Sequence, residues 1–287
     1  MSEPPRGSDS ISPTAHYTGH VWARNGLSPP ELATAAGRLS FNSLRPAMAI
    51  SSAFGGPTLE QFLLARHRLI DHLLEEAIAA GRVSAVLEVA CGMSPRGWRF
   101  ARRHGRDIAY VEADLPAMAE RKREALARAG SLTDRHRVVE IDALAESGPL
   151  SLGAVAAELD REQGLAVITE GLLTYLDRDG VTGLWTRIAD TLPGFANGVY
   201  LSDLHLAREN AGPLAAGFLH GLSLFVRGRV RLHFLDEGEA RDALAEAGFA
   251  SAILHRPRDF ASSIEVPGRG ADLVRVIEAR PVSQPGI

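Results

Sequence analysis

The fold of this 287-residue chain is decided by the stretch Val83-Ser-Ala-Val-Leu-Glu-Val-Ala-Cys-Gly-Met-Ser-Pro-Arg96. Its first eight residues form an apolar run typical of a buried strand, and the turn at Cys91-Gly92 leads into a helical segment. A glycine and a small residue at such a turn let the backbone approach a ligand, and the N–H groups of the following helix can bind an anionic group. The turn lacks the G-x-G-x-x-G pattern, so no pyrophosphate site is expected, and a purely structural turn is an equal alternative.

Short apolar runs and helical segments alternate after this stretch, which predicts βαβ units on a parallel sheet. The expected strands are 83–90, 108–114, 137–142, 165–170 and 198–203, and the expected helices are 97–104, 116–129, 152–162, 179–192 and 236–247. Two last strands, 251–256 and 272–280, have no helical pattern between them and should pair antiparallel. The prediction is a seven-stranded α/β sheet, not the six-stranded dinucleotide-binding sheet.

Two segments lie outside this alternation. The first eighty residues show no strand pattern and one strong helix, 59–80, while 206–234 interrupts the pattern after the fifth strand. Both are expected to cap the edge of the sheet where open α/β folds bind ligands. The domain prediction is a disordered start over 1–12, a helical cap and cofactor lid over 13–80, and the α/β core over 81–287.

Counts of single residues exclude several protein classes. Cys91 is the only cysteine, which excludes disulfide frameworks and cysteine-based metal sites. Lys122 is the only lysine, and the charged run Glu120-Arg-Lys-Arg-Glu124 predicts that it lies on a solvated helix face. A Schiff-base enzyme or a Walker-A ATPase is therefore not expected.

Charge and hydropathy limit the partners and the compartment. The net charge is −4 with both signs interspersed, which disfavours a nucleic-acid-binding surface. No apolar run approaches the roughly 18–20 residues that span a bilayer, and 1–12 has no hydrophobic signal core. We expect a cytoplasmic monomer or homodimer that binds neither nucleic acid nor membrane.

Two carboxylates at predicted strand ends suggest a nucleoside site. Asp114 ends the second strand and is placed to accept hydrogen bonds from a ribose diol, and Asp142 ends the third and could accept from an adenine amino group. Each residue alone is compatible with a helix cap or a solvated turn. Together with the Cys91-Gly92 turn they describe a nucleoside site without a pyrophosphate cradle.

Three ordered motifs carry a family resemblance. They are Glu-Val-Ala-Cys-Gly-Met-Ser-Pro-Arg-Gly-Trp-Arg (88–99), Tyr-Val-Glu-Ala-Asp-Leu-Pro (110–116) with Arg-Lys at 121–122, and Thr-Glu-Gly-Leu-Leu-Thr-Tyr-Leu (169–176). They resemble the leucine carboxyl methyltransferase family, a branch of the class I S-adenosylmethionine (SAM)-dependent methyltransferases. The segment Ser-Pro-Thr-Ala-His-Tyr-Thr-Gly-His-Val-Trp-Ala-Arg (12–24) is similar to tetracenomycin-type polyketide O-methyltransferases within it. The resemblance runs from about Ser12 to Ala279.

The resemblance implies SAM as the cofactor and assigns its contacts. The implied cofactor residues are Arg66 for the methionine carboxylate, Glu88, Ala90 and Gly92 beside the methionine part, Asp114 with Leu115 for the ribose, Asp142 with Ala143 for the adenine, and Glu170 with Gly171 near the methionine amino group. Arg68 competes with Arg66 for its role. Arg96 matches a family arginine that could serve the cofactor or pair with a neighbouring carboxylate. The family often has Gly-x-Gly where this chain has Ala90-Cys-Gly92.

The acceptor site is less defined. The expected substrate-facing residues are His16, Tyr17, His20, Trp22, Arg24 and Tyr175. His16 and His20 have the i, i+4 spacing of metal ligands, but no third ligand is nearby, so no metal is expected. His205 and His220 are the candidate catalytic bases for a phenolic acceptor, whereas a carboxylate acceptor is already ionised and needs no base.

The predicted function is therefore SAM-dependent O-methylation of a carboxylate, or of a phenolic hydroxyl, on a small polyketide-like molecule. One alternative is methyl esterification of a protein C-terminus, which needs a surface that grips a partner protein. The other is a non-catalytic SAM-fold binding protein.

Overall fold

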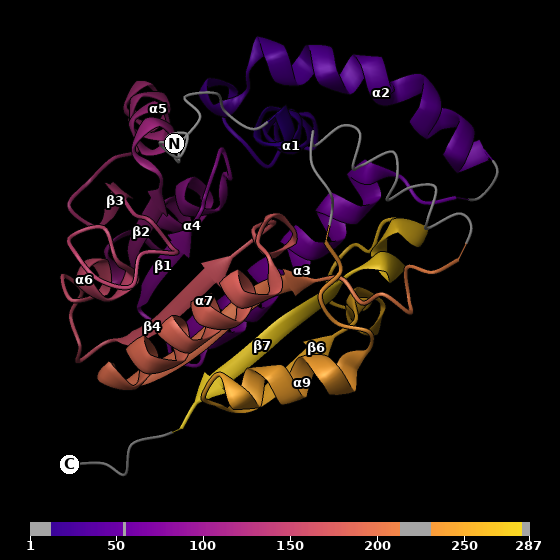
Figure 1. The fold of residues 1–287 in the computed structure, drawn as a ribbon. Coiled ribbons are helices and arrows are strands. Elements are labelled where there is room, and N and C mark those ends of the chain that lie inside the picture. Colours follow the sequence, from indigo (N-terminus) through magenta and orange to yellow (C-terminus); the bar gives the residue numbers. More distant parts are fainter. Residues whose placement is uncertain (1–12, 54–55, 213–230, 283–287) are drawn as a thin grey trace, which may run out of the picture.

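The computed structural model of the chain describes residues 13–53, 56–212 and 231–282. Its central sheet contains seven strands in the order β3-β2-β1-β4-β5-β7-β6 (Figure 1). Their bounds are β1 Ala85–Val89, β2 Ala109–Asp114, β3 His136–Glu140, β4 Gly164–Thr169, β5 Asn197–Leu204, β6 Phe249–His255 and β7 Arg275–Pro281. The predicted seven-stranded α/β sheet is confirmed.

The first five strands pair in parallel, and β7 runs antiparallel to both β5 and β6, which confirms the expected antiparallel end of the sheet. The strand order reverses between β1 and β4, because the chain leaves β1 toward β2 and β3 and returns to β4 on the other side. In open α/β sheets, ligands bind in the crevice at the carboxyl ends of the strands at such a reversal.

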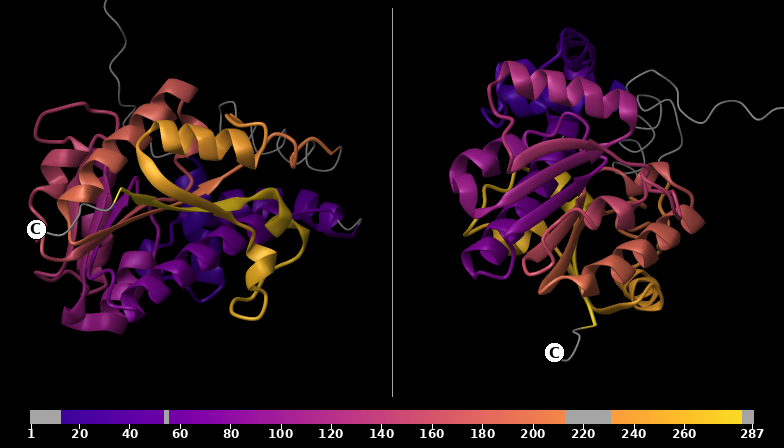
Figure 2. Two further views of the ribbon diagram at one scale, coloured as in Figure 1. Left: turned by 90° about the horizontal axis from the view of Figure 1, so that it is seen from below. Right: turned by 90° about the vertical axis from the view of Figure 1, so that its left-hand side faces the viewer.

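Helices cover both faces of the sheet. The helices after β1 have the bounds α4 Arg96–His104, α5 Pro116–Arg128, α6 Leu152–Ala156, α7 Arg178–Thr191 and α9 Glu237–Glu246. Helices α6, α7 and α9 pack on one face, around the fully buried Trp185, while α4 packs on the other face through Phe100 (Figures 1 and 2). The predicted helix 152–162 is shorter than expected and ends at Ala156. Further along, Asp160 accepts the backbone N–H of Glu162 in a separate turn.

Helix α3 (Leu59–Ala79) joins the cap to the core. Thr58 caps its first turn in a reciprocal arrangement with Gln61, which satisfies backbone N–H groups that a helix start leaves free. Its second half buries Leu69 and Leu74 against the same face of the sheet as α4. Its first half packs against the N-terminal segment, and the strong helix predicted over 59–80 is confirmed.

Within the expected helical cap, the N-terminal segment contains two helices whose bounds the sequence pattern did not give, α1 (Pro13–Arg24) and α2 (Ala35–Ala53). They pack against each other, with the rings of Tyr17 and Phe41 5.6 Å apart. Figure 1 shows them above the carboxyl ends of the central strands, where a cap was expected. Of the segment 206–234, only 206–212 and 231–234 are described, and 1–12 lies outside the described residues. None of the described helices combines the length and apolar character needed to cross a bilayer.

Candidate functional site

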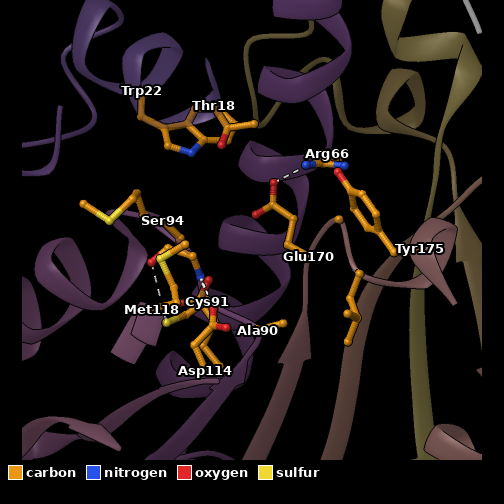
Figure 3. A pocket seen from close by; sticks show the side chains of 15 residues that line it. Thr18, Trp22, Arg66, Ala90, Cys91, Ser94, Asp114, Met118, Glu170 and Tyr175 are labelled. Carbon is orange, nitrogen blue, oxygen red and sulfur yellow. Dashed lines mark hydrogen bonds and ion pairs between the residues drawn. The ribbon is translucent and has the colours of Figure 1, made fainter. Parts of the chain in front are cut away.

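A pocket lies at the carboxyl ends of β1, β2 and β4, beneath α1 (Figure 3). It is lined by Thr18, Trp22, Arg66, Glu88, Ala90, Cys91, Gly92, Met93, Ser94, Asp114, Met118, Glu170, Gly171, Leu172 and Tyr175. Figure 3 shows Thr18 and Trp22 across the opening from Asp114 and Ala90. The pocket therefore combines predicted cofactor residues from three strand ends with two side chains of the cap.

The turn after β1 and the end of β2 form one end of this pocket. Gly92 N donates to Asp114 Oδ2 over 2.7 Å, and Leu115 N donates to Asp114 Oδ1 over 2.8 Å. Burial raises the pKa of Asp114, and these two N–H donors oppose that rise. A carboxylate offers about four acceptor positions, so Asp114 keeps acceptor capacity for the two hydroxyls of a diol.

Ala90 has a φ of 54°, in the left-handed region that favours glycine. An alanine there costs about 1 kcal/mol or more. This conformation is a physical reason for a glycine at the position, and this chain adopts it with alanine.

Arg66 and Glu170 form the other end. Arg66 Nε donates to Glu170 Oε1 over 3.0 Å, and its Nη1 donates to Asp203 Oδ2 over 2.8 Å. Gly171 has a φ of +74°, which favours glycine, and a Cβ there would lie 2.9 Å from Arg66 Nη2, so a side chain would force the guanidinium to move. Arg68 instead pairs with Glu265 and does not line the pocket, whereas Arg66 does.

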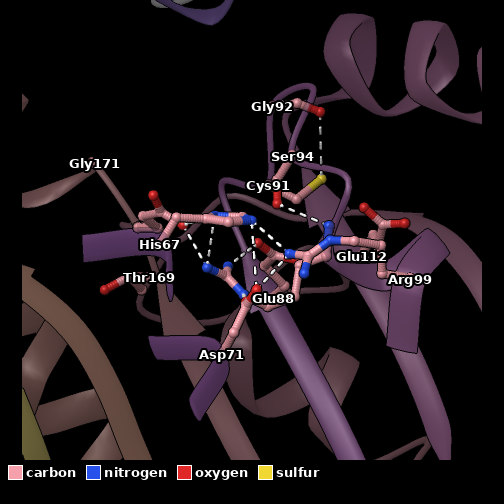
Figure 4. Close-up of polar contacts among 12 residues, drawn as sticks. His67, Asp71, Glu88, Cys91, Gly92, Ser94, Arg99, Glu112, Thr169 and Gly171 are labelled. Carbon is pink, nitrogen blue, oxygen red and sulfur yellow. Dashed lines mark hydrogen bonds and ion pairs between the residues drawn. The ribbon is translucent and has the colours of Figure 1, made fainter. Parts of the chain in front are cut away.

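Arg96 is fully buried behind this end and contacts three carboxylates. Two of them, Asp71 and Glu88, are labelled in Figure 4, near His67. The Arg96 guanidinium donates to Asp71 over 2.6 Å, to Glu88 over 2.6 Å and to Glu170 over 2.5 Å. Burial alone would raise the pKa of Glu170, but the contacts with His67 and with Arg96 hold it well below its ordinary value. Of the two roles predicted for Arg96, the structure places it in carboxylate pairing, and it does not line the pocket.

His67 connects the cap to this network, a role that the sequence pattern did not indicate. Its ring stacks on Trp22 with centroids 4.2 Å apart, and its Nδ1 lies 2.8 Å from Glu170 Oε2. Arg99 Nη2 lies 2.6 Å from His67 Nε2. Arg96 Nη2 lies 2.9 Å from His67 Nδ1, so a guanidinium faces each ring nitrogen. Burial lowers the pKa of His67, which favours the neutral form of the ring.

Several predicted cofactor and substrate residues lie away from the pocket. Asp142 accepts the N–H of Leu144, the carbonyl of Ala143 accepts from Arg187, and neither residue is among the lining residues. Leu115 is 51% exposed and contacts the site only through its N–H group.

The substrate-facing residues predicted on α1 are divided between its sides. Trp22 faces the pocket, with Thr18 one turn before it, while His20 and Arg24 line a separate cleft. Tyr17 is 1% exposed and packs in the hydrophobic cluster of the cap, and His16 bonds Thr34. The i, i+4 spacing of Thr18 and Trp22 was the available signal for the pocket-facing side.

The two candidate catalytic histidines are not in the described pocket lining. His205 is buried, with Nδ1 2.9 Å from the carbonyl oxygen of Leu273. His220 lies outside the described residues. In the described part of the chain, no group of three His, Cys, Asp or Glu side chains is arranged to hold a metal ion.

Lys122 corrects the expectation of a solvated helix face, which was wrong. It is 0% exposed, pairs with Glu112 of β2, and donates from Nζ to the carbonyl oxygen of Ser94 over 2.6 Å. His136 Nε2 lies 2.7 Å from the other oxygen of Glu112. Burial alone would raise the pKa of Glu112, but Lys122 and His136 hold it below its ordinary value. Through these contacts, the only lysine links α5 to β2 and to the pocket-lining loop at Ser94.

Replacing Lys122 with methionine is expected to lower the free energy of unfolding by about 3 kcal/mol, because Glu112 stays buried without its cation. His136 limits the loss, since its Nε2 still contacts the other oxygen of Glu112. Urea unfolding at pH 7 measures the change, with Arg128→Met on the exposed end of α5 as the control. Equal losses in both variants would contradict a stabilising role for the buried pair.

Comparison with known proteins was consistent with this geometry. The family model of leucine carboxyl methyltransferases matches residues 27–189. A Streptomyces coelicolor protein named "Putative S-adenosyl-L-methionine-dependent methyltransferase" is 34% identical over 128 residues, which are 45% of this chain and 44% of that protein. The chain spans about half the length of the curated relatives that it matches.

Two solved structures share the fold at low identity. A "putative methyltransferase" from Thermobifida fusca matches with a TM-score of 0.63 and 14% identity over 93% of this chain and 94% of that one. The S-adenosylmethionine-dependent methyltransferase SibL, in its apo form, matches with a TM-score of 0.53 and 18% identity over 94% and 69%. The seven-stranded sheet with its antiparallel end is the class I methyltransferase fold that the motifs predicted.

Proposed function

The chain belongs to the leucine carboxyl methyltransferase family, and we propose that it transfers the methyl group of SAM to a carboxylate oxygen of a small aromatic, polyketide-like molecule. The observation that carries this proposal is the pocket itself, which has an acceptor of diol hydrogen bonds at one end, Asp114, and an opposite-charge pair at the other, Arg66 with Glu170.

The residues present fit the two ends of SAM. An amino acid group carries one ammonium and one carboxylate, which match Glu170 and Arg66 charge for charge. Arg66 lines the pocket although it already bonds Glu170 and Asp203, so its guanidinium faces a ligand from a fixed position. Asp114 keeps acceptor capacity for the ribose hydroxyls. When bound, SAM would supply an electrophilic methyl on a sulfonium. S-adenosylhomocysteine (SAH) would be the leaving group, because the C–S bond breaks as the acceptor oxygen forms its bond to the methyl carbon.

The described lining favours an acceptor that is already ionised. The described lining contains no histidine. Burial raises the pKa of the Cys91 thiol well above its ordinary value, whereas the pKa of Glu170 is held well below its own ordinary value by His67 and Arg96. A carboxylate needs no base, whereas a phenol with a pKa of about 10 would benefit from one. The lining also offers Trp22, Met118 and Leu172 as apolar surface. These walls would exclude water and hold acceptor oxygen, methyl and sulfur in line.

The test is incubation of the protein with methyl-labelled SAM and matched aromatic acceptors, one carrying only a carboxyl group and one only a phenolic hydroxyl. We expect label in the acid, released as methanol by mild alkali because the product is an ester. Label in the phenol, stable to alkali as an ether, would overturn the carboxylate assignment. Transfer only to a peptide with a free C-terminus would favour the protein-modifying alternative, and SAH binding without turnover on any acceptor would favour a binding protein.

A further inference from the structure

Asp203, near the end of β5, is a buried carboxylate that bonds both Arg66 and Gly171, two residues that line the same end of the pocket. Its Oδ2 accepts from Arg66 Nη1 over 2.8 Å, and its Oδ1 accepts from the N–H of Gly171 over 2.6 Å. Asp203 is 3% exposed and does not line the pocket, so a ligand there would not touch it. One carboxylate therefore fixes a side chain of α3 and the backbone of the loop after β4 at the same time.

His205 supports this carboxylate from the far side. Its Nδ1 lies 2.9 Å from the carbonyl oxygen of Leu273, and its Nε2 lies 3.5 Å from Asp203 Oδ2. A carbonyl oxygen only accepts, so Nδ1 donates to Leu273, and Nε2 faces the Asp203 carboxylate. The Phe62 ring packs against both partners of Asp203: its centroid lies 5.0 Å from that of the His205 ring and 5.2 Å from the guanidinium carbon of Arg66.

We propose that Asp203 and His205 are positioning residues that hold Arg66 and Gly171 in the arrangement that receives the amino acid end of SAM. This inference rests on the proposed function, because it concerns the same pocket. It assigns to His205 a role behind the site instead of the catalytic role expected from the sequence, and it adds Asp203, which no motif indicated.

The charges explain why a carboxylate is needed. Burial alone would raise the pKa of Asp203, but Arg66 and His205 hold it below its ordinary value, so the group is an anion at neutral pH. In Asp203→Asn, one amide oxygen can still accept from Gly171 N, but the amide nitrogen then faces the Arg66 guanidinium, donor against donor. Arg66 would lose one of its two anchors while the shape of the site is kept.

The experiment compares two ligands that differ only at the amino acid end. SAH carries the ammonium and carboxylate, and 5′-methylthioadenosine has the same nucleoside and sulfur without them. Isothermal titration calorimetry measures the dissociation constant of each ligand with wild type, Asp203→Asn, His205→Asn and Asp242→Asn. Asp242, exposed on α9, is the matched control for loss of an aspartate.

For Asp203→Asn we expect a dissociation constant for SAH about 10-fold higher, with that of 5′-methylthioadenosine unchanged within about 2-fold. His205→Asn keeps a donor for Leu273 near the Nδ1 position but loses the contact with Asp203, so a smaller shift of about 3-fold, again only for SAH, is expected. Asp242→Asn should match wild type for both ligands.

Three other results would each decide against part of the argument. If binding of both ligands is weakened equally in Asp203→Asn, Asp203 acts only on general stability and the inference is overturned. Unchanged SAH binding in both variants would also overturn it. If Asp203→Asn does not fold, as thermal unfolding would show, the selective loss must appear in His205→Asn, or the inference fails. Absence of SAH binding by wild type would overturn the proposed function itself.

Discussion

Replacing Arg96 with methionine is expected to lower the free energy of unfolding by about 5 kcal/mol at pH 7, at the upper end of the values for breaking buried ion pairs. The guanidinium is 0% exposed and donates to Asp71 of α3, Glu88 of β1 and Glu170 directly after β4. Methionine has a similar length but offers no donor, so these carboxylates would stay buried without their common cation. Chemical denaturation at pH 7 measures the loss.

The pH dependence of this difference follows from the direction of the pKa shifts. In the wild type the pKa values of Asp71 and Glu170 lie below their ordinary values, so their contribution to stability is present above about pH 4 and is lost as the pH falls through the folded-state values. Without Arg96, only His67 and Arg99 beside Asp71, and His67 and Arg66 beside Glu170, still oppose burial. The folded-state pKa values therefore rise, and the variant loses less stability as the pH falls. The difference between wild type and variant should be largest near pH 7 and narrow toward pH 4.

Arg106→Met is the control for this experiment. Arg106 pairs with Asp134 over 3.0 Å, but the two side chains are 84% and 68% exposed, and such surface pairs contribute about 0–1 kcal/mol. A loss in Arg96→Met no larger than in Arg106→Met, or a difference that is constant from pH 4 to 7, would contradict the central role of Arg96.

The core of the fold could be predicted because each strand carries its own local signal. The runs that became β1, β4 and β5 are mostly apolar segments between turns, and burial on both faces of a parallel sheet favours that pattern. The antiparallel end followed from the missing helix between the last two strands. Helices α1 and α2 gave weaker signals: α1 buries only Tyr17, Val21 and Trp22 in its cluster, and α2 contains Pro46, which disfavours a helix interior.

The buried ionic networks could not be read from local patterns, because the partners are far apart in the sequence. The run around Lys122 has the composition of a solvated helix face, and its burial depends on Glu112 in a neighbouring strand. A signal was present in the strands themselves, since Glu88 and Glu112 interrupt apolar runs and stand side by side in the register of β1 and β2. Carboxylates inside a covered parallel sheet need buried cations or donors, which here are Arg96, Tyr110 and Lys122.

Arg66 was predicted from the family resemblance, with Arg68 as its competitor, and the contacts of these two arginines allow a sharp test. Arg66→Lys is expected to raise the dissociation constant for SAH about 10- to 100-fold, since an ammonium is a single point charge that cannot replace a planar fork. The Arg66 fork reaches Glu170 with Nε and Asp203 with Nη1. A lysine ammonium on a flexible stem would bind one carboxylate closely and lose the fixed orientation toward the pocket.

Arg68→Lys is a control on the same helix, because Arg68 contacts Glu265 at the surface and does not line the pocket. We expect SAH binding within about 2-fold of wild type in this variant. Titration calorimetry of both variants under the same conditions gives the comparison, with thermal unfolding to establish that each is folded. A large loss of SAH affinity in Arg68→Lys, with a small loss in Arg66→Lys, would assign the SAM carboxylate to Arg68. Arg66 would then serve only as the partner of Glu170 and Asp203. We expect the larger loss of SAH affinity in Arg66→Lys for a geometric reason. Only the guanidinium of Arg66, and not that of Arg68, is held where the ends of β4 and β5 meet the pocket.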